Sequence, residues 1–327
     1  ENQSMLGRRI LRMKAFKVLY GYAVTGKMTL DDAMYELDRS CEATRDLYLF
    51  MLAIISPLTK EAHDRIEMAK TKFNPTEEDL DPNMKFVENQ VAPILDNDPD
   101  FQKLLARKGL SWQPYDMLIK SVLDSMKEKP YFQRYMASET RSLKEDCKLF
   151  IKIFENEFVD NEQLAAILED KSVYWIDDLA YSLTFCCRTM EDFAAGQGWR
   201  LPELYQSDML KKKNPAADVQ SDKVFVTRLL KNAFAGYEGY FKMISESVKG
   251  WESDRLNSSD IALVALGLAE AESFPEIPLK VTMNEYVEIS KCYSLPKSSS
   301  FVNGLLDKLI SKMVEDGKIV KKGAGLV

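Results

Sequence analysis

Apolar residues recur every three or four positions along most of the chain, which is the spacing of one face of an α-helix. The pattern predicts helices over about 8–23, 29–55 and 60–72, several more up to about 193, and four between about 222 and 317. Alternation long enough for a sheet is absent, apart from a possible short pair of strands in 318–327. We therefore predict an all-α fold.

Turn and capping residues divide these helices. An acidic loop with two prolines occupies 74–82, and the helical pattern fades between about 194 and 220, where glycines, prolines and three consecutive lysines predict a long loop. Thr29 and Asp32, three residues apart, have the spacing of a capping box at a helix start. Thr282 and Glu285 have the same spacing, and we predict that a helix begins there too.

Composition narrows the functional classes. The net charge of −7 argues against a nucleic-acid binder, although binding depends on where the charges lie. The five cysteines include no CxxC pair and predict reduced thiols in a cytoplasmic protein. Cys186 and Cys187 follow an apolar stretch and are expected to be buried structural thiols. With His63 as the only histidine, we expect no catalytic triad, metal site or cofactor.

The first predicted helix is strongly basic. Arg8 and Arg12 lie four residues apart and share one helical face, with Arg9 about 100° round the axis. A face that is arginine in its first turns and apolar later suggests a helix end that stands clear of the core, where guanidinium groups can reach phosphates. A solvated basic helix start is the alternative, although cations at a helix N-terminus are unfavourable with the helix dipole.

Both ends of the sequence carry a recognisable series of motifs. Near the C-terminus these are a tryptophan followed by Asp-Arg at 251–255, Ile-Pro at 277–278, Asn-Glu at 284–285 and Phe-Val-Asn-Gly at 301–304. The N-terminus has the arginine-rich segment at 8–12 and Leu-Tyr at 19–20. In this order and spacing the motifs resemble the NusB family of transcription antitermination factors.

The resemblance implies a pair of three-helix bundles with an additional helical insertion. It covers residues 5–58 as NusB-like N-terminal helices and residues 222–316 as the C-terminal bundle. Residues 59–221 are then a helical insertion and 317–327 a tail. The sequence assigns no role to the insertion.

In function, the resemblance implies a protein that is not an enzyme. It would bind box A-type RNA of ribosomal RNA transcripts together with ribosomal protein NusE, in the RNA polymerase antitermination complex. A helical interaction scaffold without RNA binding is one alternative. An RNA-binding accessory related to the N-terminal domain of ribosomal RNA cytosine methyltransferases is another, but it would need a following catalytic domain, whereas the NusB-like segment here ends the chain.

The candidate site residues follow from the basic helix and from the resemblance. Phe301, near the start of the last helix, is a possible stacking platform for a base, although it could equally be core. The candidate RNA-binding residues are Arg8, Arg9, Arg12, Lys14, Lys17, Lys297, Ser298 and Phe301. The candidate partner-binding residues are Tyr20, Glu270 and Glu288. Glu270 follows an apolar run but is not required to point inward, and Glu285 is assigned to capping.

Overall fold

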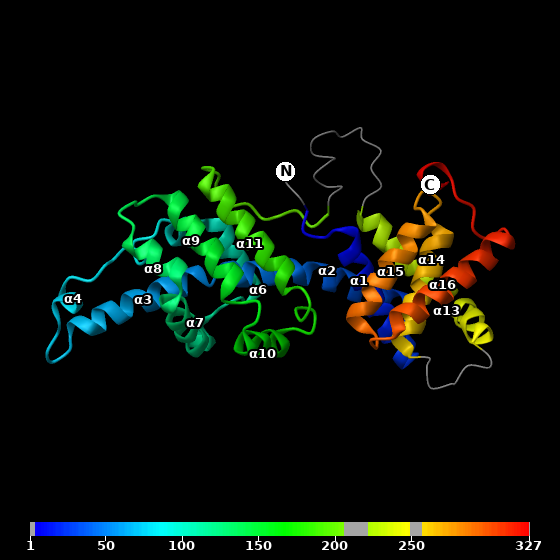
Figure 1. The fold of residues 1–327 in the computed structure, drawn as a ribbon, viewed down its shortest axis with the longest axis horizontal. Helices are drawn as coiled ribbons and strands as arrows, with labels where there is room; N and C mark the ends of the chain where they lie inside the picture. Colours follow the sequence, from blue (N-terminus) through cyan, green and yellow to red (C-terminus); the bar gives the residue numbers. More distant parts are fainter. Residues whose placement is uncertain (1–3, 206–221, 249–256, 327) are drawn as a thin grey trace. The chain divides into compact units, whose positions relative to one another are not determined.

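The computed structural model describes residues 4–205, 222–248 and 257–326. Within these ranges it contains helices and no β-strand, so the prediction of an all-α fold is confirmed (Figure 1). The chain forms two compact units: unit 1 comprises Glu1–Cys41 and Glu203–Val327, and unit 2 comprises Glu42–Pro202. Helix α2 (Leu30–Leu52) contributes residues to both units.

These unit boundaries differ from the predicted limits of the insertion at 58/59 and 221/222. The second half of α2 belongs to unit 2 because its side chains pack there: the Tyr48 hydroxyl lies 2.8 Å from Thr189 Oγ1 and accepts a hydrogen bond from Trp199 Nε1 at 3.1 Å. Residues from 203 onward belong to unit 1 because the backbone N–H groups of Met5 and Leu6 donate to the carbonyls of residues 203 and 204, both at 2.9 Å.

Unit 1 is built around one central helix, α14 (Ser258–Ser273). All twelve residues from Asp260 to Ala271 are buried, as expected for a helix that is covered on every side. Gly267 permits the close packing, since a Cβ there would lie 2.8 Å from Leu306 Cδ2. The helices that pack against α14 are α1 (Arg8–Thr25), α13 (Asp222–Ser247), α15 (Leu279–Tyr293) and α16 (Ser298–Glu315).

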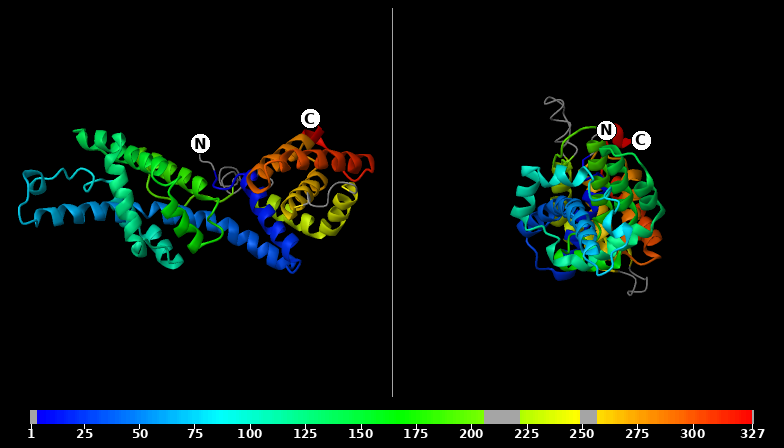
Figure 2. Two further views of the ribbon diagram at one scale, coloured as in Figure 1. Left: turned by 60° about the horizontal axis from the view of Figure 1, so that its bottom comes forward. Right: turned by 90° about the vertical axis from the view of Figure 1, so that its left-hand side faces the viewer.

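Unit 2 consists of the second half of α2 and a series of shorter helices (Figure 2). Its most extensive helix–helix contact is between α9 (Leu143–Asn156) and α11 (Leu179–Ala194). The other elements are α3 (Ile55–Lys70), α4 (Glu77–Leu80), α5 (Val91–Asp96), α6 (Pro99–Lys108), η1 (Gln113–Tyr115), α7 (Asp116–Glu128), α8 (Pro130–Ala137) and α10 (Glu162–Lys171). Its core is rich in aromatic side chains, among them Phe150, Phe154, Phe158 and Phe193.

The two predicted capping boxes have different outcomes. The one at Thr29 is confirmed, because the backbone N–H of Thr29 donates to Asp32 and that of Asp32 donates back to Thr29 Oγ1, at 3.0 and 3.2 Å. The one at Thr282 is wrong, since α15 begins three residues earlier, at Leu279, and places Thr282 inside the helix. The possible strand pair in 318–327 is also absent up to residue 326, where the chain forms the short helix η3 (Gly323–Leu326).

Candidate functional site

Helix α1 does not stand clear of the core, so this part of the sequence interpretation is wrong. Eight of its residues are buried: Ile10, Leu11, Arg12, Lys14, Ala15, Phe16, Val18 and Leu19. The helix packs against α13 and α14, and the guanidinium groups of Arg8 and Arg12 lie 5.0 and 5.2 Å from the centre of the Phe225 ring. Its basic first turns are therefore part of the packing of unit 1.

Arg12 and Glu270 form a buried ion pair that connects α1 to α14. Arg12 Nε and Nη2 donate to the two carboxylate oxygens of Glu270 at 2.7 and 2.8 Å. The same oxygens accept hydrogen bonds from Thr282 Oγ1 at 3.0 Å and from the Tyr286 hydroxyl at 2.9 Å. Arg12 is 3% exposed and Glu270 is fully buried, so four donors compensate the carboxylate for its lost hydration.

The hydrogen bonds and charges of this network shift the pKa values of Arg12 and Tyr286. Burial alone would lower the pKa of Arg12, but the hydrogen bonds to Glu270 and the charges of Glu270 and Glu285 raise it above its ordinary value. Burial and the charge of Glu270 raise the pKa of Tyr286, so its hydroxyl remains a donor. The network has a structural role, and neither Arg12 nor Glu270 presents a surface to RNA or to a protein partner.

Two further predicted RNA-binding residues are also buried. The Lys14 ammonium donates to the carbonyl of Ser40 at 2.7 Å and lies 3.2 Å from its hydroxyl. Ser298 donates from Oγ to Asp260 Oδ2 at 3.0 Å. Both side chains connect elements within unit 1, since Lys14 joins α1 to α2 and Ser298 joins α16 to α14. The sequence shows their basic or polar character but not these distant partners.

Arg8 and Arg9 are exposed but ion-paired. Arg9 binds Glu285 with both Nε and Nη2, at 2.9 and 2.7 Å, while its side chain remains 53% exposed. Arg8 lies 3.5 Å from Asp222. The bond from Arg9 and the nearby charge of Arg12 lower the pKa of Glu285, so this residue is a charged partner of α1 rather than the predicted helix cap.

An accessible edge of unit 1 lies along the outer stripe of α1, defined by Arg9, Lys17 and Tyr20. The Lys17 ammonium lies 5.6 Å from the centre of the Tyr293 ring, at the end of α15, and Tyr20 is exposed. Lys17 is about 12 Å along the helix axis from Arg9, given the rise of an α-helix. The stripe thus places two cations and one tyrosine along α1, next to a second tyrosine from α15.

Three other predicted residues lie on or near the surface. Lys297 is exposed immediately before α16, four residues after Tyr293. Phe301 is half-buried in the first turn of that helix. Glu288 is exposed on α15 and pairs with Lys291. Tyr293 was missed from the sequence, although an aromatic residue between Lys291 and Lys297 was a usable signal. The tryptophan motif at 251–255 lies outside the described residues.

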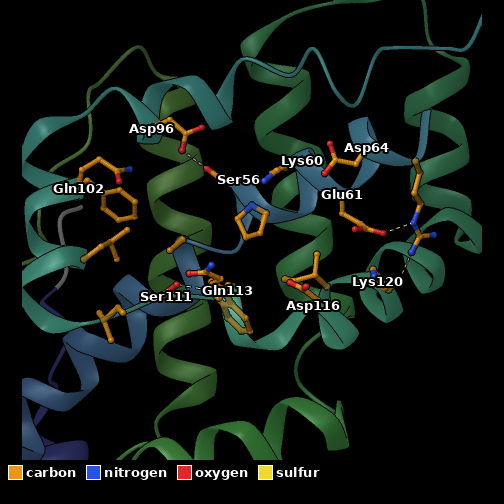
Figure 3. A pocket seen from close by; sticks show the side chains of 18 of the residues that line it. Ser56, Lys60, Glu61, Asp64, Asp96, Gln102, Ser111, Gln113, Asp116 and Lys120 are labelled. Carbon is orange, nitrogen blue, oxygen red and sulfur yellow. Dashed lines mark hydrogen bonds and ion pairs between the residues drawn. The ribbon is translucent and has the colours of Figure 1, made fainter. Parts of the chain in front are cut away.

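Unit 2 contains an open hollow of about 800 Å³ between α3, α6 and α7 (Figure 3). Its floor is formed by apolar side chains such as Phe101 and Trp112, and its rim by charged residues such as Lys60 and Asp116. Ser56 Oγ donates to Asp96 Oδ1 at 2.5 Å, and no histidine or cysteine lines the hollow. The hollow is therefore polar at its rim but lacks an imidazole or thiol for catalysis.

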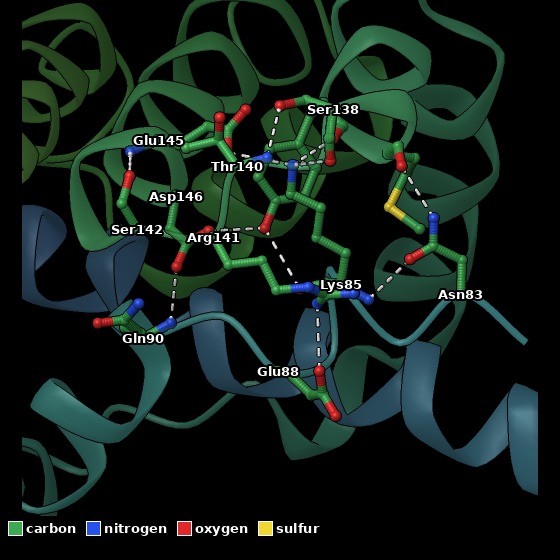
Figure 4. A network of polar contacts seen from close by, with 12 residues as sticks. Asn83, Lys85, Glu88, Gln90, Ser138, Thr140, Arg141, Ser142, Glu145 and Asp146 are labelled. Atoms are coloured by element: carbon green, nitrogen blue, oxygen red, sulfur yellow. Dashed lines mark hydrogen bonds and ion pairs between the residues drawn. The ribbon is translucent and has the colours of Figure 1, made fainter.

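A second polar cluster of unit 2 surrounds Lys85 (Figure 4). The buried ammonium donates to the carbonyls of Tyr135 and Ser138 at 2.6 and 2.8 Å and lies 3.1 Å from Glu145 Oε2. Asp146, next in sequence, accepts from the Tyr135 hydroxyl at 2.7 Å and from the backbone N–H of Gln90 at 2.9 Å. These contacts hold the segment after α4 against the start of α9.

Residues 4–205, 222–248 and 257–326 contain neither a metal-ligand cluster nor a membrane-spanning helix. No group of three or more His, Cys, Asp or Glu side chains in these ranges could hold a metal ion. None of the described helices combines the length and apolar character that crossing a lipid bilayer requires.

Comparison with known proteins identifies relatives for part of the chain. Residues 195–311 match the model of the NusB family. Three bacterial proteins named transcription antitermination protein NusB are similar. The one from Salinibacter ruber is 31% identical over 113 residues, which are 35% of this chain and 71% of that protein. The one from Chloroherpeton thalassium is 33% identical over 111 residues, which are 34% of this chain and 52% of that protein. The one from Listeria innocua is 35% identical over 94 residues, which are 29% of this chain and 72% of that protein.

The family model covers none of residues 42–194, which form almost all of unit 2. No solved structure matches the chain.

Proposed function

Because the chain belongs to the NusB family of transcription antitermination factors, we propose that it binds box A-type RNA of ribosomal RNA transcripts as a heterodimer with ribosomal protein NusE. The observation that carries the RNA-binding part is the outer stripe of α1. The exposed Arg9 and the half-buried Lys17 place cations along one helix edge, beside the aromatic rings of Tyr20 and Tyr293. Cations for phosphates and rings for unpaired bases are the two elements that single-stranded RNA binding uses.

The distribution of charge supports the same proposal. Unit 1 contains 24 lysines and arginines against 22 acidic residues, a net charge of +2. Unit 2 contains 20 against 29, a net charge of −9. The acidity of the whole chain therefore belongs to unit 2, almost all of which lies outside the family match, whereas unit 1 has a small net positive charge.

We assign the RNA contacts to Arg8, Arg9, Lys17, Lys297 and Phe301, and the NusE contacts to Tyr20 and Glu288. Arg12, Lys14, Ser298 and Glu270 are left out because they are buried. Because few cations are available, the chain alone should bind RNA weakly. A basic partner that binds the same RNA strand should strengthen binding, because each protein then holds the RNA at a high effective concentration near the other.

A salt titration of RNA affinity tests the RNA-binding part. Box A RNA is titrated with NusE and either the wild type or the double variant Lys17→Gln, Lys297→Gln. Loss of two phosphate contacts should flatten the slope of log affinity against log salt by about 1.4, at about 0.7 per contact. The matched control is Lys103→Gln, Lys120→Gln, which removes the same charge from exposed positions of unit 2. Equal slopes for wild type and the Lys17 variant would contradict the assignment, and no RNA binding by any form would favour a scaffold.

Binding of NusE without RNA tests the partner contacts. Tyr20→Ala should weaken the complex at least tenfold if Tyr20 is an interface anchor. The control Tyr35→Ala removes a more exposed tyrosine from α2 and should leave the affinity for NusE unchanged. Glu288→Lys should mainly slow association, as expected for a charge at the rim of an interface. An unchanged dissociation constant for Tyr20→Ala would remove this face of α1 from the NusE site.

A further inference from the structure

The end of unit 2 formed by the last turns of α3, the following loop and α4 exposes large apolar side chains. We call residues 67–81 the α3–α4 tip. Phe73 is 99% exposed, Met68 71% and Leu80 60%. Figures 1 and 2 show that the tip extends beyond the other helices of unit 2. Single exposed apolar residues are common, but three large ones within thirteen positions of one projecting loop are typical of a binding surface.

The tip is held in one conformation by its own polar contacts. Thr76 and Asp79 form a capping box at the start of α4, with hydrogen bonds of 2.9 and 3.1 Å. The Lys72 ammonium pairs with Asp79 at 2.8 Å, across the loop that contains Phe73. These contacts lower the pKa of Asp79 to about 2, so its carboxylate is charged at any physiological pH. Phe73 is therefore presented by an ordered loop, which reduces the entropy lost on binding.

The charge of the tip restricts what can cover it. The tip contains five acidic residues and two lysines, and both lysines are paired within it, Lys70 with Glu67 and Lys72 with Asp79. Among the residues that the structure describes, Glu77, Glu78 and Asp81 have no ion-pair partner. The surface therefore repels RNA, anionic lipid and a second acidic tip. A positively charged surface attracts it.

We propose that the α3–α4 tip is a docking element for a basic protein, which takes Phe73 into an apolar pocket and surrounds it with lysine or arginine side chains. Phe73 supplies the buried anchor, with Met68 and Leu80 beside it. Glu77, Glu78 and Asp81 form the charged rim that steers association. This binding is independent of the RNA surface on unit 1, so it holds whether or not the chain binds box A RNA.

Site-specific photocrosslinking in the full-length chain tests the proposal. A benzophenone amino acid replaces Phe73 in cells of the source organism, and a matched chain carries it at Met117, which is 78% exposed on α7 of the same unit. A protein with a basic surface should crosslink from position 73 and not from 117. The same product from both positions, a product with RNA, or one with a second copy of this chain would overturn the proposal.

The crosslinked protein is then purified, and its affinity for the unmodified chain is measured. Phe73→Ala should weaken binding at least tenfold, and Met117→Ala should leave it unchanged. Glu77→Lys with Glu78→Lys should slow association and remove most of its salt dependence. Each variant should retain its helices, because all the altered side chains are exposed. Circular dichroism checks this. Equal affinity of wild type and Phe73→Ala would exclude Phe73 as the anchor and overturn the proposal.

Discussion

Arg12 of unit 1 and Lys85 of unit 2 are both buried cations, and they are neutralised in different ways. In unit 1 the guanidinium of Arg12 meets a carboxylate from α14, 258 positions away in sequence. In unit 2 the ammonium of Lys85 meets two backbone carbonyls and a carboxylate that is itself partly exposed. The planar guanidinium fork matches a carboxylate, whereas an ammonium is a point charge that carbonyl oxygens can satisfy.

This difference indicates how each unit responds to mutation. Removing Arg12 leaves the Glu270 carboxylate buried with no access to water, because Glu270 has no exposed surface. Removing Lys85 leaves carbonyls and Glu145, which is 21% exposed in its side chain and can turn toward solvent. The loss of Arg12 should therefore destabilise unit 1 more than the loss of Lys85 destabilises unit 2.

The largest expected effect is that of Arg12→Met. Loss of one partner of a buried pair should reduce the free energy of unfolding of unit 1 by about 3–5 kcal/mol. Amide hydrogen exchange resolved by segment measures this loss in α1 and α14 while α9 and α11 of unit 2 report the other unit. Arg9→Met, which breaks an exposed pair, is the control and should cost less than about 1 kcal/mol.

The double variant Arg12→Met, Glu270→Leu sharpens the same comparison. It removes the uncompensated charge, so it should be more stable than Arg12→Met alone. If the double variant were as unstable as the single one, packing rather than charge would explain the role of Arg12.

A smaller effect is expected for Lys85→Met. The variant loses hydrogen bonds to two carbonyls, and a buried group left unsatisfied costs about 1–3 kcal/mol. Exchange should accelerate in α8 and α9 and remain unchanged in α14. Lys103→Met, at an exposed position of unit 2, controls for the loss of one charge. A loss as large as that of Arg12→Met would show that the two units do not differ in this respect.

Thr29→Ala should cost about 1 kcal/mol, because it removes the cap at the start of α2. This helix begins in unit 1 and ends in unit 2, so the variant tests whether the two halves open together. We expect amide exchange to become faster in residues 30–41 and to stay at the wild-type rate in residues 42–52. Thr25→Ala, whose hydroxyl bonds only to the carbonyl of Gly21 four residues earlier, is a suitable control. Equal acceleration along the whole helix would show that α2 opens as one element.

Local features of the fold could be predicted from the sequence, and distant ones could not. The capping box of Thr29 needs only a partner three residues away, and the helical period needs only a short window. The similar pattern at Thr282 misled because a tertiary contact takes precedence there: its hydroxyl donates to Glu270 from within α15. Sequence spacing gave no information on this contact.

For the candidate site, the sequence did not reveal which basic residues of α1 are buried and which are paired at the surface. The basic character of α1 is visible in the sequence, whereas the side chains that meet it come from α13, α14 and α15, more than 200 positions away. The helical period of 3.6 residues places Arg8 and Arg12 on one face, but it does not indicate that the Glu270 carboxylate lies against Arg12. The unit boundary inside α2 was missed for the same reason, since a continuous helical pattern contains no signal of which core each half joins.

The smallest expected effect concerns the exposed pair of unit 1, Arg9 and Glu285, and it depends on pH. The hydrogen bond from Arg9 and the charge of Arg12 lower the pKa of Glu285 below its ordinary value of 4.5. A carboxyl group with a lowered pKa in the folded state stabilises the fold at every pH above 4.5, and this contribution disappears as the pH falls through the folded pKa. Its size should be about 0.2–1 kcal/mol, because the Arg9 side chain is 53% exposed and screened by solvent.

Segment-resolved amide exchange of wild type and Glu285→Gln at pH 7 and at pH 3 measures this contribution. The variant should be less stable than wild type at pH 7, the difference should shrink at pH 3, and unit 2 should show no difference at either pH. A difference that stays constant between the two pH values would mean that the charge of Glu285 does not stabilise unit 1.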